Sequence, residues 1–228
     1  MGVCLCVNYD NKAQKNIIVN KYNIVDEKNN CENYYYKTVN QTTSNISIEN
    51  PTIDYFENNF LKEINFVRTN PKEYANKLKE LTKNIYKEDN TEYYYPNKNN
   101  SNEKILLKNG SKVFYNTIDY LQNLQPVNKL VWNEALKIEN YDKNLIFTKE
   151  NVGKIILQKR LELLKTYKNC FFNIDIFKDP ILSILFQITD DDFNQVRRNA
   201  IINKNFSKFA VNCLTDKHNN FYSICCFV

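Results

Sequence analysis

The first six residues carry the most distinctive chemistry of this chain. They are Met1-Gly2-Val3-Cys4-Leu5-Cys6. Removal of Met1 exposes the α-amine of Gly2, the group that accepts a myristoyl chain, although the usual pattern has Ser or Thr where this chain has Cys6. Because one myristoyl chain binds a bilayer only weakly, with an association constant on the order of 10⁴ M⁻¹, stable anchoring needs a second group. Palmitate on Cys4 or Cys6 would supply that group, and we expect both kinds of modification.

A cluster of basic residues could also serve as the second membrane anchor, but residues 1–30 do not contain one. Residues 1–30 hold four Lys against Asp10, Asp26 and Glu27. The alternative to acylation is an unmodified start whose small apolar residues form a buried strand or have no role. We expect residues 1–50 to be an acylated tail and spacer, which if flexible would span roughly 35 Å. Residues 51–228 then form the folded domain.

Composition and charge exclude several classes of protein. The 228 residues include only 3 Gly, which excludes glycine-rich phosphate loops and collagen-like repeats. The 31 basic and 26 acidic side chains give a net charge of +5 without a block of one sign, so we expect no nucleic-acid partner. No apolar run approaches the roughly 18–20 residues of a bilayer span.

The cysteines and the start of the chain indicate a compartment. There are 7 cysteines, an odd number without framework spacing, and the first residues do not resemble a signal peptide. We therefore expect a reduced, lipid-anchored chain at the cytoplasmic face of the plasma membrane or an internal membrane, not a secreted one.

Few other residues suggest catalysis. His218, the one histidine, lies in an expected turn between Thr215 and Asn220, where a solvated role is the simpler interpretation. Neighbouring strand residues point to opposite faces, so we do not expect Cys225 and Cys226 to chelate one ion. A Cys–His nucleophile pair would need that turn to fold back over a strand.

Hydrophobic spacing predicts the helices that must position any site. Their apolar faces are, in chain order, Phe56-Phe60-Ile64-Val67, Tyr74-Leu78-Leu81-Ile85, Phe114-Ile118-Leu121 and Ile181-Ile184-Leu185-Ile188. Asn70-Pro71, with Glu73, and Asp179-Pro180 are typical helix starts. A further helix is expected around residues 133–141, and residues 86–110 are expected to be a long loop.

The C-terminus changes period and predicts a β-hairpin. Two short apolar runs, 208–214 and 221–228, flank a polar stretch. Both faces of the second run are apolar, which favours a sheet covered on both sides. The expected fold class is α+β, with a central sheet between two helical layers.

Several segments resemble the CAP superfamily, which comprises cysteine-rich secretory, antigen 5 and pathogenesis-related 1 proteins and whose domain is also called SCP. Asn65, Arg68 and Pro71 match the motif of the family's first helix. The other similar segments are Leu130-Val131-Trp132-Asn133-Glu134-Ala135-Leu136, Glu150-Asn151-Val152 (like the Gly-Glu-Asn-Ile strand motif), Asp179 to Asp192 with Arg197-Arg198-Asn199, and the terminal hairpin. The resemblance covers roughly residues 54–228, interrupted by insertions near 86–110 and 154–178, and it implies a CAP-like three-layer α-β-α sandwich.

The departures from the family pattern bear on function. The family cleft holds two histidines and two acidic residues that can bind a divalent metal. Here Glu150 matches the motif glutamate, Val196 stands where a histidine precedes Arg197, and no histidine follows Trp132 before Glu150. Since catalytic zinc needs about three protein ligands, we expect Glu150 to be vestigial, with no metal, cofactor or catalytic residue.

The resulting hypothesis is a non-enzymatic, membrane-tethered CAP/SCP-like domain that binds a lipid, a sterol or a protein partner. Lipid and sterol binding are implied only by the resemblance. One alternative is an unrecognised enzyme that uses Glu150 with the Asp190, Asp191 and Asp192 cluster as paired carboxylates. The other alternative is a purely structural lipid-anchored adaptor.

Overall fold

A computed structural model describes residues 52–97, 104–139, 149–189, 195–215 and 221–228 of the chain. The helices are α1 (Ile53–Thr69), α2 (Pro71–Leu81), α3 (Lys112–Asn123), α4 (Lys149–Leu163), α5 (Pro180–Ile188) and α6 (Val196–Ile201), with 3₁₀ turns η1 (Thr82–Asn84) and η2 (Glu134–Leu136). The strands are β1 (Ile85–Glu88), β2 (Thr91–Tyr94), β3 (Ile105–Leu106), β4 (Val131–Trp132), β5 (Phe171–Asp175), β6 (Lys208–Thr215) and β7 (Phe221–Phe227). The fold is α+β, as expected.

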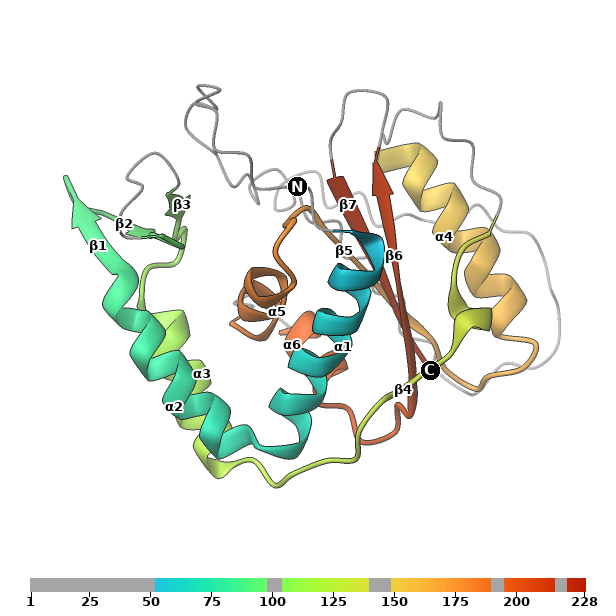
Figure 1. The fold of residues 1–228 in the computed structure, drawn as a ribbon, viewed down its shortest axis with the longest axis horizontal. Coiled ribbons are helices and arrows are strands. Elements are labelled where there is room, and N and C mark those ends of the chain that lie inside the picture. The colour runs from blue at the N-terminus through green and yellow to red at the C-terminus, as the bar shows by residue number, and fades with distance from the viewer. Residues whose placement is uncertain (1–51, 98–103, 140–148, 190–194, 216–220) are drawn as a thin grey trace, which may run out of the picture.

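A four-stranded sheet of order β4-β6-β7-β5 forms the centre of the domain (Figure 1). β6 and β7 pair antiparallel from Phe209 opposite Phe227 to Thr215 opposite Phe221, which confirms the predicted hairpin. β5 pairs antiparallel with β7, and the short β4 runs parallel to β6. The turn that would join the hairpin strands, with His218, lies outside the described residues.

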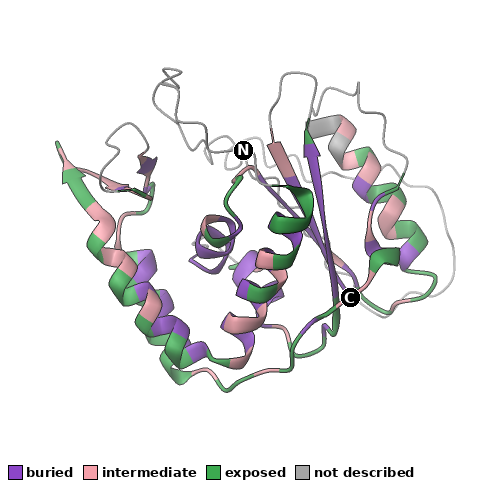
Figure 2. Ribbon diagram, viewed as in Figure 1, coloured by how far each residue is buried: buried purple, intermediate pink, exposed green. Residues whose placement is uncertain are grey.

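Helices cover both faces of this sheet (Figure 1). Alternate residues of β6 and β7 enter two separate hydrophobic clusters, because successive strand side chains point to opposite faces. Phe209, Val211 and Phe227 pack with α1, α5 and α6, while Ala210 and Ile224 pack on the side covered by α4. The apolar character of both strand faces, noted in the sequence, follows from this cover (Figure 2).

The predicted apolar stripe of the first helix is confirmed. Phe56, Phe60, Ile64 and Val67 of α1 are all completely buried. At the start of α5, the Asp179 carboxylate accepts hydrogen bonds from the N–H groups of two residues of the first turn, as the Asp-Pro pair predicts. α1 packs against both α5 and β6 and so joins the helical layer to the sheet.

The region that follows α2 differs from the prediction. Ile85, expected on the second helix, begins β1 instead. Residues 86–110, expected to be a loop, contain most of a three-stranded antiparallel sheet, β1-β2-β3. Asp89 and Asn90 connect β1 to β2 with φ of 46° and 73°, which is the geometry of a tight two-residue hairpin turn.

Two further predictions about secondary structure are wrong. The helix expected over residues 133–141 is only the 3₁₀ turn η2, after which the chain extends at Lys137. The strand expected at Glu150-Asn151-Val152 is the beginning of α4. The segment 154–178, expected as an insertion, holds the rest of α4 and all of β5.

Candidate functional site

The residues that match the first-helix motif of the resemblance join distant parts of the chain. The Asn65 side chain on α1 donates to the backbone carbonyl of Leu130 at 3.0 Å and accepts from the N–H of the same residue at 2.7 Å. Leu130 precedes Val131 and Trp132 of β4, the segment that carries the second motif. Asn65 therefore fixes α1 against the edge of the central sheet.

Arg68, one turn further along α1, is completely buried. Its guanidinium donates to four backbone carbonyls, at Asn128 (2.7 Å), Ile201, Asn203 (3.1 Å) and Phe206 (3.0 Å). Burial lowers the pKa of Arg68 to about 10, so the group is still charged at neutral pH. The planar five-donor fork of arginine suits such a set of fixed carbonyls, which lysine would not reach together.

The third motif, Arg197-Arg198-Asn199, lies on α6 next to these carbonyls. Both arginines are buried, and Arg198 donates from Nε to the Ile188 carbonyl at the end of α5 at 2.9 Å. Val196 is the first residue of α6. The motif residues thus hold α1, α5, α6 and β4 together.

The residues expected to act chemically are not brought together in the described part of the chain. Glu150 lies on α4, and its side chain is outside the described residues, as are Asp190, Asp191, Asp192 and His218. Gly2, Cys4 and Cys6 also lie outside them. Among the residues that the structure describes, no three His, Cys, Asp or Glu side chains are grouped as a metal site.

A buried polar cluster that the sequence analysis missed lies between β5 and α5. The Asp175 carboxylate is 3 % exposed and accepts from Ser183 Oγ at 2.7 Å, Gln187 Nε2 at 3.2 Å and the N–H of Ile176 at 2.7 Å. Ser183 and Gln187 stand four residues apart on α5 and bond to each other at 3.0 Å. This spacing in the sequence indicates that the two polar side chains lie on one side of a helix. The other residues of that helix are mostly apolar, so the pair does not stand out as a polar site.

The β-strand side of this cluster is not fully paired. Asn173 and Asp175 are two residues apart on β5 and lie opposite Cys225 and Ser223 of β7. The amide of Asn173 and the Ser223 hydroxyl are buried without a hydrogen-bond partner. Such unpaired groups cost stability. The hydrogen bonds of Asp175 to Ser183 and Gln187 join β5 to α5.

The described cysteines are poor nucleophiles. Cys170, Cys213, Cys225 and Cys226 are free and buried. Burial raises the pKa of Cys213 to about 12, and it also raises the pKa of each of the other three thiols. Since the thiolate is the reactive form, these side chains act as core residues.

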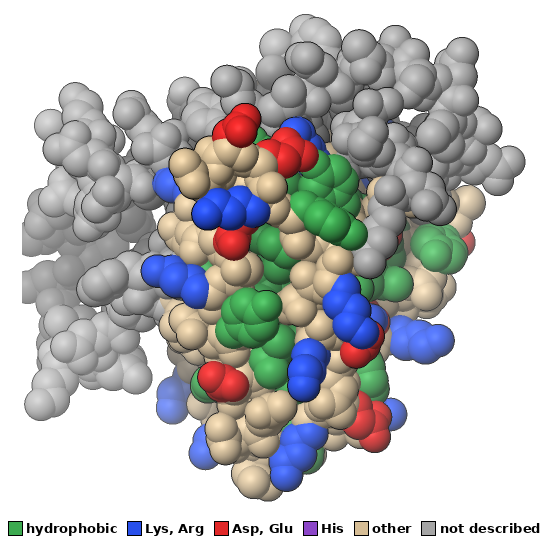
Figure 3. Space-filling view, turned by 90° about the vertical axis from the view of Figure 1, so that its left-hand side faces the viewer, with side chains coloured by type: hydrophobic (Ala, Val, Ile, Leu, Met, Phe, Trp, Pro, Cys, Tyr) green, Lys and Arg blue, Asp and Glu red, His purple; other side chains and the backbone are tan. Residues whose placement is uncertain are grey.

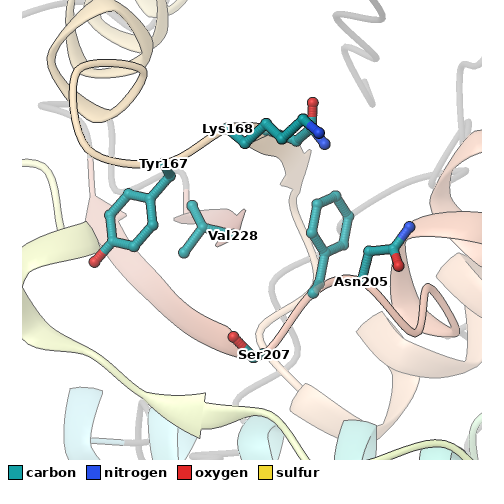
Figure 4. Close-up of a pocket in the computed structure, with 7 residues that line it drawn as sticks. Tyr167, Lys168, Asn205, Ser207 and Val228 are labelled. Carbon is teal, nitrogen blue, oxygen red and sulfur yellow. The ribbon is translucent and has the colours of Figure 1, made fainter.

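A surface hollow lies beside the C-terminal end of the sheet, with a volume of about 440 Å³ (Figure 4). It is lined by Tyr167, Lys168, Asn169, Asn205, Phe206, Ser207 and Val228. The Lys208 ammonium lies 5.2 Å from the centre of the Tyr167 ring, whose hydroxyl accepts from Asn133. The hollow offers amide, hydroxyl and ammonium groups beside two aromatic rings, those of Tyr167 and Phe206.

The opposite end of the molecule, formed by α2, α3 and the small sheet, has a mixed surface. Basic and acidic side chains alternate there with hydrophobic ones (Figure 3). Lys104 illustrates the mixing, because it pairs with Glu88 and lies 4.4 Å from the centre of the Tyr93 ring. This face therefore shows no field of one sign.

None of the described helices has the length and hydrophobicity needed to cross a bilayer. Comparison of the chain with family models, with curated proteins and with solved structures finds no match.

Proposed function

We propose that the chain is a CAP/SCP-like binding domain held at the cytosolic face of a membrane by acyl groups on Gly2 and on Cys4 or Cys6. The observation that carries the proposal is the convergence of the motif residues. Asn65 and Arg68 contact the segments around Leu130 and residues 201–206, which carry or follow the other two motifs. Residues that match a family pattern at distant positions support a common fold when they also touch.

The order of layers supports a CAP-like sandwich. α1, α5 and α6 lie on one side of the sheet and α4 on the other. The sequence comparison above matches the family strand motif to Glu150-Asn151-Val152, which lie on α4; we propose instead that Asn173-Ile174 on β5 correspond to its Asn-Ile pair. Phe172 then takes the position of the motif glutamate, in place of Glu150.

This placement favours a binding role over an enzymatic one. A phenylalanine in place of the glutamate, Val196 in place of one histidine and the lack of a histidine between Trp132 and Phe172 leave the family's metal-binding set without three of its four members. The polar cluster around Asp175 is closed to solvent, and the described thiols are protonated at neutral pH. The domain therefore acts by binding, with a lipid or a protein as partner.

Acyl labelling tests the tether. Wild-type chain expressed in eukaryotic cells should incorporate labelled myristate and palmitate and sediment with membranes. Gly2→Ala should lose both labels and become soluble, and Cys4→Ser/Cys6→Ser should lose palmitate and most of the membrane-bound fraction. Cys31→Ser serves as the matched control and should behave as wild type. A soluble, unlabelled wild-type chain would overturn the proposal.

Zinc titration tests the binding role separately. We expect no stoichiometric, submicromolar site by isothermal titration calorimetry. A site of that affinity that disappears in Glu150→Gln would show that this carboxylate is a ligand and would contradict the placement of the motif on β5.

A further inference from the structure

Helix α4 has hydrophobic side chains on two sides. Ile156 and Leu163 face the sheet and are 3 % and 4 % exposed. Leu157, Leu161 and Leu164 are instead 42 %, 52 % and 43 % exposed. Since the last three are four and three residues apart, they lie along one side of the helix. α4 itself lies at one edge of the described part of the molecule (Figure 1).

This outer side is open along its length. Leu164 continues the helical turn beyond α4, with its N–H bonded to the Arg160 carbonyl at 2.9 Å. Gly153 lies four residues before Leu157, and nothing comes within 4 Å of the position that a Cβ would take there. We call Gly153, Leu157, Leu161 and Leu164 the leucine face.

Basic residues border the leucine face. Residues 153–168 contain five Lys or Arg and one acidic residue, Glu162. Lys154, Lys165 and Lys168 are exposed. Glu162 pairs with Lys159 at 3.1 Å, so the one acidic residue of this stretch is engaged by one of its five basic residues. The border is therefore positively charged.

We propose that the leucine face contacts an anionic phospholipid surface, an inference that rests on the proposed membrane tether. An apolar side flanked by Lys and Arg is the pattern of helices that lie in the bilayer interface, where leucines enter the acyl boundary and basic groups meet the headgroups. A second copy of the chain fits less well. If two copies of the chain packed their leucine faces together about a two-fold axis, their positively charged borders would lie close to each other, and like charges repel.

Vesicle binding tests this contact without the acyl groups. The full-length chain carrying Gly2→Ala, Cys4→Ser and Cys6→Ser is sedimented with vesicles of phosphatidylcholine alone or with added phosphatidylserine. Binding should require phosphatidylserine and fall as salt rises. Leu157→Ser/Leu161→Ser should weaken it at least about tenfold, and Lys154→Glu/Lys165→Glu by a similar factor.

The control variant is Ile53→Ser/Tyr55→Ser, which removes two side chains of α1 that are 54 % and 55 % exposed. It should bind as well as its parent, and thermal melts should show that all variants fold. The inference is overturned if the acyl-free chain does not bind, or if the leucine and α1 variants lose binding equally. It is also overturned if the leucine variant turns a dimer into a monomer in gel filtration.

The two proposals fail separately. Acyl labelling with no vesicle binding by the acyl-free chain would leave the tether and remove the contact. Vesicle binding through the leucine face by a chain that is never acylated in cells would do the reverse.

Discussion

The two faces of the central sheet are closed in different ways. On one face three helices pack over the strands, and α5 leaves only Ile181 well exposed. On the other face α4 is the main cover, and it buries Ile156 and Leu163 while Leu157, Leu161 and the adjoining Leu164 are exposed. The first face also contains two buried polar groups that join several elements, the guanidinium of Arg68 and the carboxyl group of Asp175.

This difference separates the residues that stabilise the fold from those available for contacts. Buried charged groups hold several elements in one geometry, so their removal should lower the free energy of unfolding. Exposed leucines add little to stability but offer apolar area to a partner. Substitutions on the two faces should therefore have opposite consequences for stability and for binding.

The largest loss of stability is expected for Arg68→Met. The substitution leaves the carbonyls of Asn128, Ile201, Asn203 and Phe206 without their donor in a buried site. We expect the free energy of unfolding to fall by at least about 3 kcal/mol, measured by urea denaturation. The control Lys62→Met changes an exposed residue of the same helix and should cost less than about 0.5 kcal/mol. Equal effects would refute the structural role of Arg68.

A smaller loss is expected for Asp175→Ala. It removes the acceptor of Ser183, Gln187 and the N–H of Ile176 inside the core. Urea denaturation should show a loss of about 2 kcal/mol. Asp119→Ala, at an exposed position of α3, is the control. If both variants unfold at the same denaturant concentration, Asp175 does not hold α5 on the sheet.

Alkaline pH should also lower the free energy of unfolding, through the buried thiol of Cys213 on the first face. The pKa of Cys213 is about 12 in the folded chain because of burial, against 9.0 ordinarily. Below about pH 9 the thiol is protonated in both states; above it the unfolded chain releases a proton that the folded chain keeps, so stability falls. At about pH 10 the loss from this thiol should be about 1.4 kcal/mol. Cys213→Ala should show a correspondingly smaller drop between about pH 8 and pH 10; an unchanged drop would contradict the assignment.

The smallest change in stability is expected on the other face. Leu157→Ser/Leu161→Ser replaces exposed side chains, so the free energy of unfolding should change by less than about 0.5 kcal/mol. The same variant should lose vesicle binding. A loss of several kcal/mol in denaturant would mean that these leucines belong to the core.

Long elements with one clear period could be predicted from the sequence. The stripe Phe56-Phe60-Ile64-Val67, the cap at Asp179 and the terminal hairpin are all present. In each of these segments, the local preference of the residues and the pattern of buried side chains favour the same secondary structure. The inference that a strand apolar on both faces needs cover on both sides also agrees with the two clusters around β6 and β7.

Predictions failed where tertiary contacts or a short turn decide the structure. The hairpin β1-β2 depends on Asp89 and Asn90, both at positive φ, in a segment that composition alone marks as a loop. The resemblance predicts a strand at Glu150-Asn151-Val152, but these residues belong to the first turn of α4. Asp175 was missed because its partners Ser183 and Gln187 belong to another element. Sequence spacing alone does not show which buried polar groups meet.

The most direct test places a tryptophan on each side of the molecule. Leu161→Trp and Tyr115→Trp change positions that are 52 % and 53 % exposed, on α4 and α3. Each acylated full-length chain is bound to phosphatidylserine vesicles that carry brominated acyl chains, and quenching beyond that of native Trp132 is measured. We expect strong quenching and a blue shift for Leu161→Trp and neither change for Tyr115→Trp. Equal quenching at both positions, or none at either, would contradict this expectation.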